Sequence, residues 1–307
     1  MCAVFGYGKQ PYYKQLRHME NETFQEEFIV GLIKDKRKIW KRGSGRNLHQ
    51  SLQEDFAAQN IKIGRDKFYE LLRRNDLLIQ PKRMRAKTTC SYHHFNKYSN
   101  LIGHAVPTRA NEIWVSDITY LWLKPQDKFC YPGMITDLYS RKVMGHCVHE
   151  SLNVNGCLVA IKEAIRLRGR DTNKPLIHHS DRGVQNCCHA YVKALEKNAI
   201  KISMTQSGDP LENAVAERIH KTIKEEFTDD RQISYCNLAT AKTEIRKFID
   251  FYNEKRPHRS VQWPTPNKAH KCTGELKRAW KSYYGQPPNG GGLMEAWAEK
   301  RLLKKAA

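Results

Sequence analysis

Three acidic residues, Asp117, Asp181 and Glu217, stand where carboxylates could do chemistry. Asp181 lies in Leu176–Asn186 (LIHHSDRGVQN), where a short predicted strand gives way to a turn. A carboxylate at a strand end often only shapes the turn, because its oxygens accept hydrogen bonds from nearby backbone amides. If other acids converge on it, their mutual repulsion requires a bound cation. The elements that carry the other two acids therefore decide between these interpretations.

Asp117 lies in the predicted strand Ile113–Leu123 (IWVSDITYLWL), which is apolar on both faces. A strand of this kind belongs in the centre of a sheet, with Trp114, Ile118 and Trp122 expected on one face. An acid buried there costs several kcal/mol unless a cation or hydrogen-bond donors compensate it. A salt bridge to one of the many basic residues is the alternative.

Glu217 lies on the helix predicted for Glu212–Phe227. A solvated ion pair with the lysine one turn further on would explain this acid without any chemistry. It would not explain the spacing, because 35 residues separate Asp181 from Glu217. The helical period places three more polar residues on the face of Glu217: Asn213, Lys221 and Lys224.

The segment that holds these acids, residues 111–270, predicts an α/β layer fold. Three strands with short connections form an antiparallel meander: Ile113–Leu123, Phe129–Arg141 and Val143–Glu150. Helix and strand then alternate, with helices over 154–168, 187–198, 212–227 and 238–252 and strands over 176–179 and 200–204. This order predicts a mixed sheet of the RNase H-like kind.

The charge of the chain points to a polyanionic partner. Lys and Arg number 53 against 32 Asp and Glu, which gives a net charge of +21 and a pI near 9.6. Such a field favours nucleic acid over a membrane surface. No apolar run reaches the length of a membrane span and the first residues lack the pattern of a signal peptide, so we expect a cytoplasmic protein.

The nine cysteines fit that location. An odd number scattered through a large chain is not typical of a disulfide framework, so we expect reduced thiols. The cysteines and histidines also lack the two closely spaced ligand pairs of a structural zinc site.

Residues 1–80 predict an all-α, helix-turn-helix-like DNA-binding region. The periodicity gives helices over Phe24–Arg42, Leu48–Ala58 and Arg65–Asn75. Residues 1–110 hold 21 Lys and Arg against 10 Asp and Glu, and residues 81–110 form a polar, basic linker. The alternative to DNA contact is a merely solvated helical face.

The last of these helices has the pattern of a recognition helix. Phe68, Leu71 and Leu72 should point inward. Four basic residues should point outward, toward DNA: Arg65, Lys67, Arg73 and Arg74.

Several segments together resemble a known family. WVSDITY, HHSDRGVQ and ENAVAERIHKTIKEE, with 35 residues between the second and third acids, resemble the D, D-35-E catalytic core of insertion-sequence transposases of the IS-three family, relatives of retroviral integrases. FIDFYNEKRPHRSVQWPTP resembles the closing motif of the family, and RDKFYELLRRNDLL its helix-turn-helix. In one place the chain departs from the family: VQNCCH brings Asn186 and two cysteines where a Tyr or a hydroxyl residue is common.

The resemblance implies a role for each acid. Asp117, Asp181 and Glu217 would be the catalytic residues and the ligands of Mg²⁺, with two ions expected and Mn²⁺ able to substitute. Carboxylates suit this, since Mg²⁺ prefers oxygen ligands, and paired cations activate the attacking oxygen and stabilise the leaving oxygen of a phosphodiester. The implied DNA-contact residues of the core and closing motif are Asn213, Lys221, Lys224, Arg256 and His258.

The implied activity is that of a DNA transposase. It would bind the terminal repeats of its element, nick the 3′ ends by water attack and transfer the strands to target DNA. A homodimer or larger complex is expected because two ends are joined, and a DNA-binding product of an upstream reading frame is a further expected partner. Two alternatives are an RNase H-like nuclease without strand transfer and a catalytically inactive DNA-binding protein. Residues 271–307, with 8 Lys and Arg against 3 Asp and Glu, form a basic tail, either a DNA-binding arm or solvated chain.

Overall fold

The sheet of segment 111–270 is mixed, and β1 (Ile113–Ile118) lies inside it. The computed structural model describes residues 9–79, 94–103, 105–169, 174–206, 213–227 and 235–276. In the sheet, β1 is antiparallel to β3 (Lys128–Asp137) on one side and parallel to β5 (Leu176–Ser180) on the other. The remaining strands are β2 (Leu121–Leu123) and β4 (Val143–His149), both paired with β3, and β6 (Ile200–Met204), paired with β5. The predicted antiparallel meander and the interior place of β1 are confirmed.

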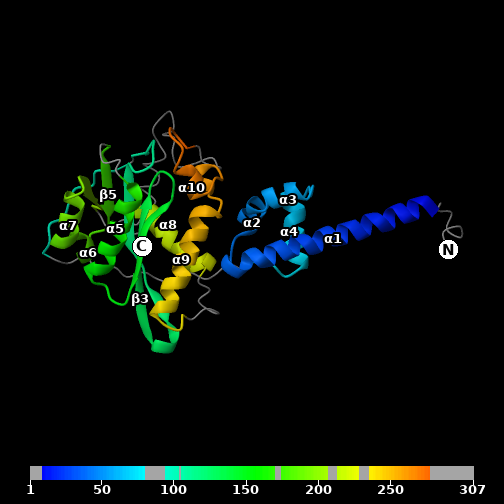
Figure 1. The fold of residues 1–307 in the computed structure, drawn as a ribbon, viewed down its shortest axis with the longest axis horizontal. Helices are drawn as coiled ribbons and strands as arrows, with labels where there is room; N and C mark the ends of the chain where they lie inside the picture. Colours follow the sequence, from blue (N-terminus) through cyan, green and yellow to red (C-terminus); the bar gives the residue numbers. More distant parts are fainter. Residues whose placement is uncertain are drawn as a thin grey trace, which may run out of the picture.

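The long first strand was wrongly predicted as one element. The chain leaves β1 after Ile118 and resumes as β2, with the Thr119 amide donating to the Pro132 carbonyl at 2.9 Å between them. β2 and the start of β3 form an arm that projects beyond the helices (Figure 1). Trp122 is 41% exposed instead of buried, and it packs edge-on against Phe129, its partner in the β2–β3 pair.

Helices cover both faces of the sheet. One face is covered by α5 (Val154–Arg168), α6 (Val184–Cys187) and α7 (His189–Glu196). The helix predicted over 187–198 corresponds to α7, and the short α6 before it, separated by the extended Cys188, was not predicted. Gly145 of β4 packs so close to α5 that a Cβ there would lie 2.1 Å from the Ala160 carbonyl oxygen. The other face is covered by α8 (Ala214–Thr222), a π-helical segment (Ile223–Phe227), α9 (Leu238–Glu254), a 3₁₀ turn (Arg259–Val261) and α10 (Pro266–Ala269).

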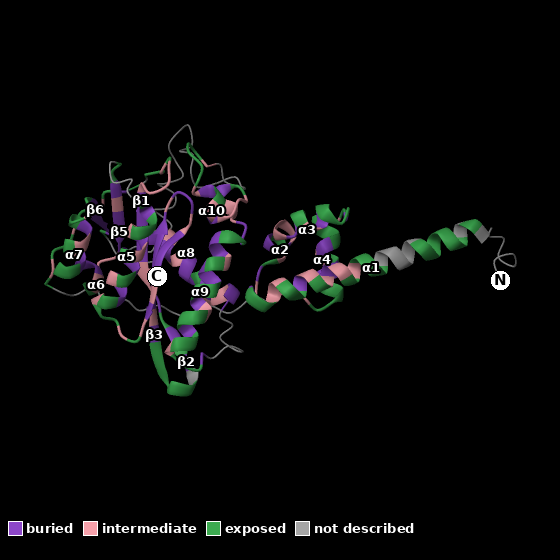
Figure 2. Ribbon diagram, viewed as in Figure 1, coloured by how far each residue is buried: buried purple, intermediate pink, exposed green. Residues whose placement is uncertain are grey.

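The N-terminal region is helical, as predicted. Its elements are α1 (Lys9–Ile39), α2 (Gly45–Ser51), α3 (Gln53–Ala58) and α4 (Arg65–Arg74). Phe68, Leu71 and Leu72 of α4 are buried, which confirms their expected inward orientation. The helix α1 begins earlier than predicted, and its first half extends away from the rest of the molecule (Figure 1). Where the burial of that half is described, at residues 10, 12–17, 23 and 24, its side chains are exposed (Figure 2).

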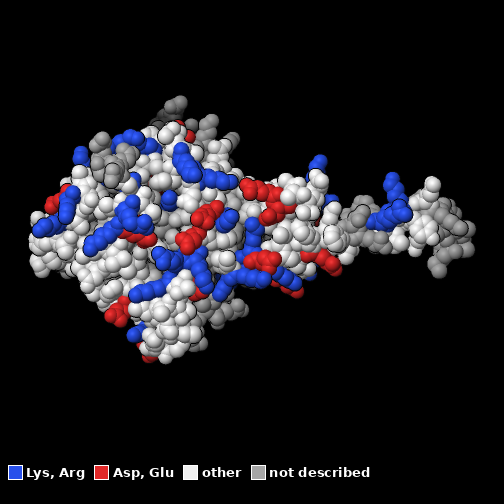
Figure 3. Space-filling view, in the orientation of Figure 1, with Lys and Arg blue, Asp and Glu red and all other residues white. Residues whose placement is uncertain are grey.

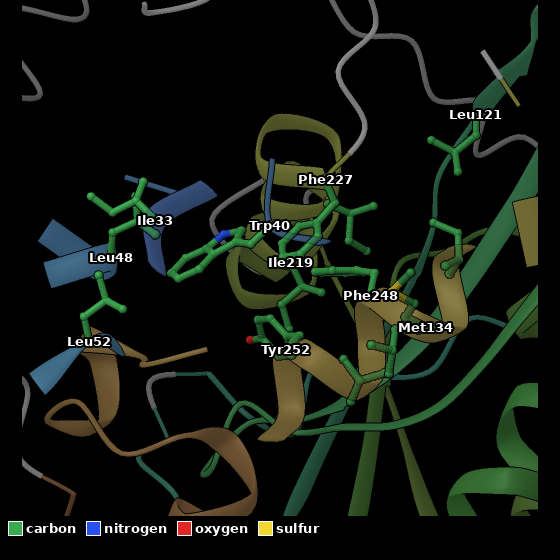
Figure 4. Packing of buried hydrophobic residues seen from close by; sticks show 14 of the residues in the cluster. Ile33, Trp40, Leu48, Leu52, Leu121, Met134, Ile219, Phe227, Phe248 and Tyr252 are labelled. Carbon is green, nitrogen blue, oxygen red and sulfur yellow. The ribbon is translucent and has the colours of Figure 1, made fainter. Parts of the chain in front are cut away.

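The N-terminal helices and segment 111–270 share one hydrophobic cluster. Trp40, which directly follows α1, packs against Phe227 of the π-helical segment and Phe251 of α9. The cluster continues without a break from Ile33 and Leu48 to Met134 (Figure 4). The two regions therefore pack as one body where α1 ends.

Part of the expected linker belongs to the core. Phe95 packs edge-on against His189 of α7, and the Leu101 amide donates to Ser203 Oγ at 2.9 Å. At the other end, the Gly274 amide donates to the Thr108 carbonyl at 2.8 Å. Residues 81–93 and 104 of the linker and 277–307 of the tail lie outside the described residues. Among the described helices, none has the length and apolar character needed to cross a membrane.

Candidate active site

Two of the predicted acids end neighbouring strands. In the parallel pair of β1 and β5, Ser116 stands beside Ser180, so Asp117 and Asp181 follow at equivalent positions of the same sheet edge. Neighbouring strands lie about 4.8 Å apart, which brings the two residues within reach of one ligand. The Asp117 side chain is 23% exposed, and its Oδ1 accepts a hydrogen bond from the Ile118 amide at 2.8 Å.

Asp181 is held by the turn that follows β5. Its Oδ1 accepts hydrogen bonds from the Gly183 amide at 3.1 Å and from Asn186 Nδ2 at 2.9 Å. Asn186 is buried, so its amide serves the carboxylate and not a surface contact. Sequence reasoning noted Asn186 only as a departure from the family and missed this role.

Glu217 is brought to the same edge by the start of α8. Asn213, which caps this helix, donates from Nδ2 to the Ser116 carbonyl oxygen at 2.9 Å. This bond ties α8 to β1 at the residue before Asp117, and Glu217 follows one helical turn later. Asn213 is only 6% exposed, so the DNA contact expected of it is wrong: its amide is used inside the protein.

His220 is a neighbour of the acids that the sequence analysis missed. Its Nε2 lies 3.8 Å from Asp117 Oδ2, and burial lowers the pKa of this imidazole to about 4. His220 is therefore neutral at pH 7 and does not form an ion pair with Asp117. Its place three residues after Glu217 on a helix was the available signal, because that spacing puts both on neighbouring sides of one turn.

The elements that carry the three acids meet at one edge of the sheet, but the three side chains are not arranged around a common metal position. In the part of the chain that the structure describes, no three His, Cys, Asp or Glu side chains are close enough to hold a metal ion together. Their chemistry nevertheless suits a hard divalent cation, because all three offer carboxylate oxygens.

The two lysines of the predicted face differ in their surroundings. Lys221 is exposed and lies 3.6 Å from Glu225, one turn further on. Lys224 is half-buried and lies in the π-helical segment, not on the continuous α-helix that the sequence predicts. Its charge contributes to the lowered pKa of His220, which places Lys224 near that ring.

The predicted DNA-contact residues of α4 are exposed. Lys67 and Arg73 face solvent, and Arg65 forms an ion pair with its neighbour Asp66 at 2.8 Å. Arg74 reaches Glu26 of α1 at 2.9 Å, so it also fastens α4 to α1. In the orientation of Figure 1, many Lys and Arg side chains lie on the visible face of the core and near the end of α1 that meets the core (Figure 3).

Within the closing motif Arg256 is buried, which corrects the DNA contact expected of it, and His258 is half-buried. Arg256 is 5% exposed and donates to both carboxylate oxygens of Glu226, at 2.6 and 2.8 Å. His258 accepts or donates at 2.7 Å with Ser260 Oγ, and burial lowers its pKa well below 6.5. Arg256 is thus used inside the protein, and the His258 ring packs edge-on against Tyr252 of α9, with ring centroids 6.0 Å apart.

A buried histidine behind the site predicts acid sensitivity. His178 of β5 contacts the Tyr191 hydroxyl at 3.0 Å, and burial lowers the pKa of His178 from 6.5 to about 3. The unfolded chain therefore binds a proton that the folded protein excludes, and stability is lost as the pH falls from about 6.5 toward 3. His178→Gln should flatten the fall in the free energy of unfolding between pH 7 and pH 4, measured by urea denaturation. His189→Gln, on the exposed face of α7, should keep the parental slope, and an equal slope for both variants would contradict the assignment.

Comparison with known proteins gives a consistent set of relatives. Two family models, both described as integrase core domain, match residues 107–210 and 198–266. The insertion element IS600 uncharacterized 31 kDa protein of Shigella sonnei is 30% identical over 266 residues, covering 84% of this chain and 93% of that protein. The transposase for insertion sequence element IS904 of Lactococcus lactis is 29% identical, covering 57% of this chain and 70% of the relative.

Among solved structures, the HTLV-2 integrase catalytic core domain in complex with magnesium is 19% identical, with a TM-score of 0.41. The match covers 53% of this chain and 97% of that domain. The RNase H-like fold is assigned from the strand order of the sheet and the integrase-core matches, and it agrees with the prediction from sequence.

Proposed function

The chain belongs to the insertion-sequence transposases with an integrase-type catalytic core, and on this basis we propose that it nicks the 3′ ends of its element and transfers them to target DNA. As a DNA transposase it is a polynucleotidyl transferase. The observation that supports the proposal best is the equivalent position of Asp117 and Asp181 at the ends of two paired parallel strands. A helix fastened to the first of these strands adds Glu217.

In this proposal the three acids hold Mg²⁺, and Mn²⁺ substitutes for it. When bound, such ions supply a Lewis acid that activates a water or hydroxyl nucleophile and stabilises the leaving oxygen. The protein's own part is orientation. Asn186 holds Asp181, the Ile118 amide holds Asp117, and Asn213 sets the start of the helix that carries Glu217.

DNA would approach along α8 and along α4. Exposed Lys221 and half-buried Lys224 lie beyond Glu217 on one helical run, where an ammonium group attracts a phosphate without reading a base. Lys67 and Arg73 of α4 would contact the element end. We further propose that the active complex contains at least two copies, because two ends have to be joined.

A strand-transfer assay tests the function. Duplex DNA that carries an element end, a supercoiled target plasmid and Mg²⁺ should give nicked ends and then joined products. Nicks without joined products would favour the RNase H-like nuclease. Binding without nicks, in both Mg²⁺ and Mn²⁺, would favour the inactive DNA-binding protein.

The lysine pair gives a prediction with a separable readout. Changing Lys221 and Lys224 together to Ala should weaken binding of the cleaved end and reduce strand transfer. The slope of log affinity against log salt should fall by about one unit for each phosphate that the variant no longer neutralises. Lys247→Ala is the matched control, since Lys247 also forms an exposed ion pair, with Glu244 at 3.0 Å. Parental binding and joining by the double variant would show that these lysines are only solvated charges.

A further inference from the structure

Glu226 joins three parts of the molecule. It lies in the π-helical segment that continues α8, so Glu217 and Glu226 belong to one helical run. The Glu226 side chain is 11% exposed and accepts hydrogen bonds from two distant regions of the chain. A π-turn within an α-helical run often marks a functional site.

The first contact comes from the N-terminal helices. Trp40 is completely buried, and its Nε1 donates to Glu226 Oε2 at 2.5 Å. The backbone adds a second bond, from the Arg42 amide to the Glu226 carbonyl oxygen at 2.8 Å. The Trp40 ring also stacks on Phe227, with ring centroids 6.5 Å apart and planes inclined by 11°. Side chain and main chain of Glu226 therefore both hold the end of α1.

The second contact comes from the end of α9. Arg256 binds Glu226 with two nitrogens, and its guanidinium lies over the rings of Trp40 and Tyr252 at 5.7 and 5.6 Å. Burial alone would lower the pKa of Arg256, but the nearby Glu226 raises it, so the guanidinium keeps its charge. A two-point bond to a planar guanidinium fixes the direction of the carboxylate as well as its position.

We propose that Glu226 is a positioning residue that, through Trp40, fixes α4 relative to the catalytic acids and thereby determines which phosphodiester of a bound DNA end is cut. The inference rests on the proposed function, in which α4 contacts the element end and Asp117, Asp181 and Glu217 cleave it. In this proposal the Glu226 carboxylate holds the N-terminal helices, which include α4, and lies on the same helical run as the catalytic Glu217.

The scale of the geometry supports a role in register. Successive base pairs of duplex DNA are about 3.4 Å apart along the axis. The helix α1 has 31 residues and so a length of about 46 Å. A rotation of about 10° at Trp40, acting over about 20 Å of this helix, would displace the DNA-binding helices by roughly one base-pair step. A loosened joint should therefore change the position of the cut and not only its rate.

The test is the position of cleavage by the full chain with Trp40→Phe. Phenylalanine keeps an aromatic ring between Phe227 and Phe251 but lacks the N–H that Glu226 accepts. On an end-labelled DNA with Mg²⁺, resolved to single nucleotides, the parent should cut at one phosphodiester. The variant should place at least a tenth of its cuts at neighbouring phosphodiesters. Trp122→Phe, on the exposed arm, should cut as the parent does.

A reduced yield at an unchanged position is what a purely structural contact predicts, and it would overturn the proposal. A second measurement does not depend on activity. Spin labels at Lys67→Cys and Lys247→Cys report the distance between α4 and α9. For this measurement every cysteine other than the buried Cys130, Cys157 and Cys187 is replaced by Ser: Cys2, Cys90, Cys147, Cys188, Cys236 and Cys272. Trp40→Phe should broaden this distance distribution, and an unchanged width would also overturn the proposal. Failure of the parent to cut any DNA would instead refute the proposed function.

Discussion

Alanine at Asp117, Asp181 or Glu217 is expected to abolish cleavage of a labelled element end while leaving duplex binding intact. Each substitution removes carboxylate oxygens that a hard divalent cation requires. None removes a basic residue, and the DNA-contact residues proposed on α4 belong to the N-terminal helical region. Cleavage should be measured on a denaturing gel in Mg²⁺ and in Mn²⁺, and binding by mobility shift at several salt concentrations.

Asp250→Ala is the control for this set, because Asp250 is an exposed acid on α9 away from the sheet edge. It should cleave at the parental rate. Undiminished cleavage by Asp181→Ala would remove the active-site assignment, since that assignment depends on the pairing of β5 with β1. Loss of binding together with cleavage would show instead that the acids maintain the fold.

Arg256→Ala should cost about 3–5 kcal/mol of stability, the range measured when one partner of a buried ion pair is removed. Among the described residues, the Trp40 indole would then be the side-chain donor left to the buried negative charge of Glu226. The free energy of unfolding should be measured by urea denaturation at pH 7, followed by both fluorescence and circular dichroism.

Replacing both partners, as Glu226→Gln with Arg256→Met, should recover part of this loss, because no unpaired charge would remain. Lys247→Ala breaks an exposed ion pair on the same helix and should change stability by less than about 1 kcal/mol. A cost below about 1 kcal/mol for Arg256→Ala would mean that Glu226 finds another donor or water. In that case the joint would be weaker than its geometry indicates.

The features predicted best from the sequence were those with a local or periodic signal. The antiparallel meander, the central place of β1 and the inward face of α4 follow from alternation and helical period. The spacing of the acids drew attention to Asp181 and Glu217, and the strand register puts Asp117 beside Asp181. The break after Ile118 was missed, because an unbroken apolar run gives no sign that β3 pairs with two separate strands.

The errors concern polar residues whose partners lie far away in the chain. The family resemblance implies DNA contacts for Asn213 and Arg256, but both are buried and bonded inside the protein. Nothing local reveals that Arg256 meets Glu226, 30 positions earlier, or that Asn213 reaches the Ser116 carbonyl, 97 positions earlier. A pattern with a period of 3.6 residues also gives no sign of the π-helical segment, which contains Lys224.

The contacts of Glu226 also order events during translation. Trp40 leaves the ribosome early, but the carboxylate that accepts its N–H lies 186 positions later. Glu226 then waits for Arg256, another 30 positions on. Before Glu226 has been synthesised, the Trp40 indole lacks its hydrogen-bond acceptor. Before Arg256 has been synthesised, the Glu226 carboxylate lacks its guanidinium partner. The joint between the N-terminal helices and residues 111–270 is therefore complete only when nearly the whole of that segment has been translated.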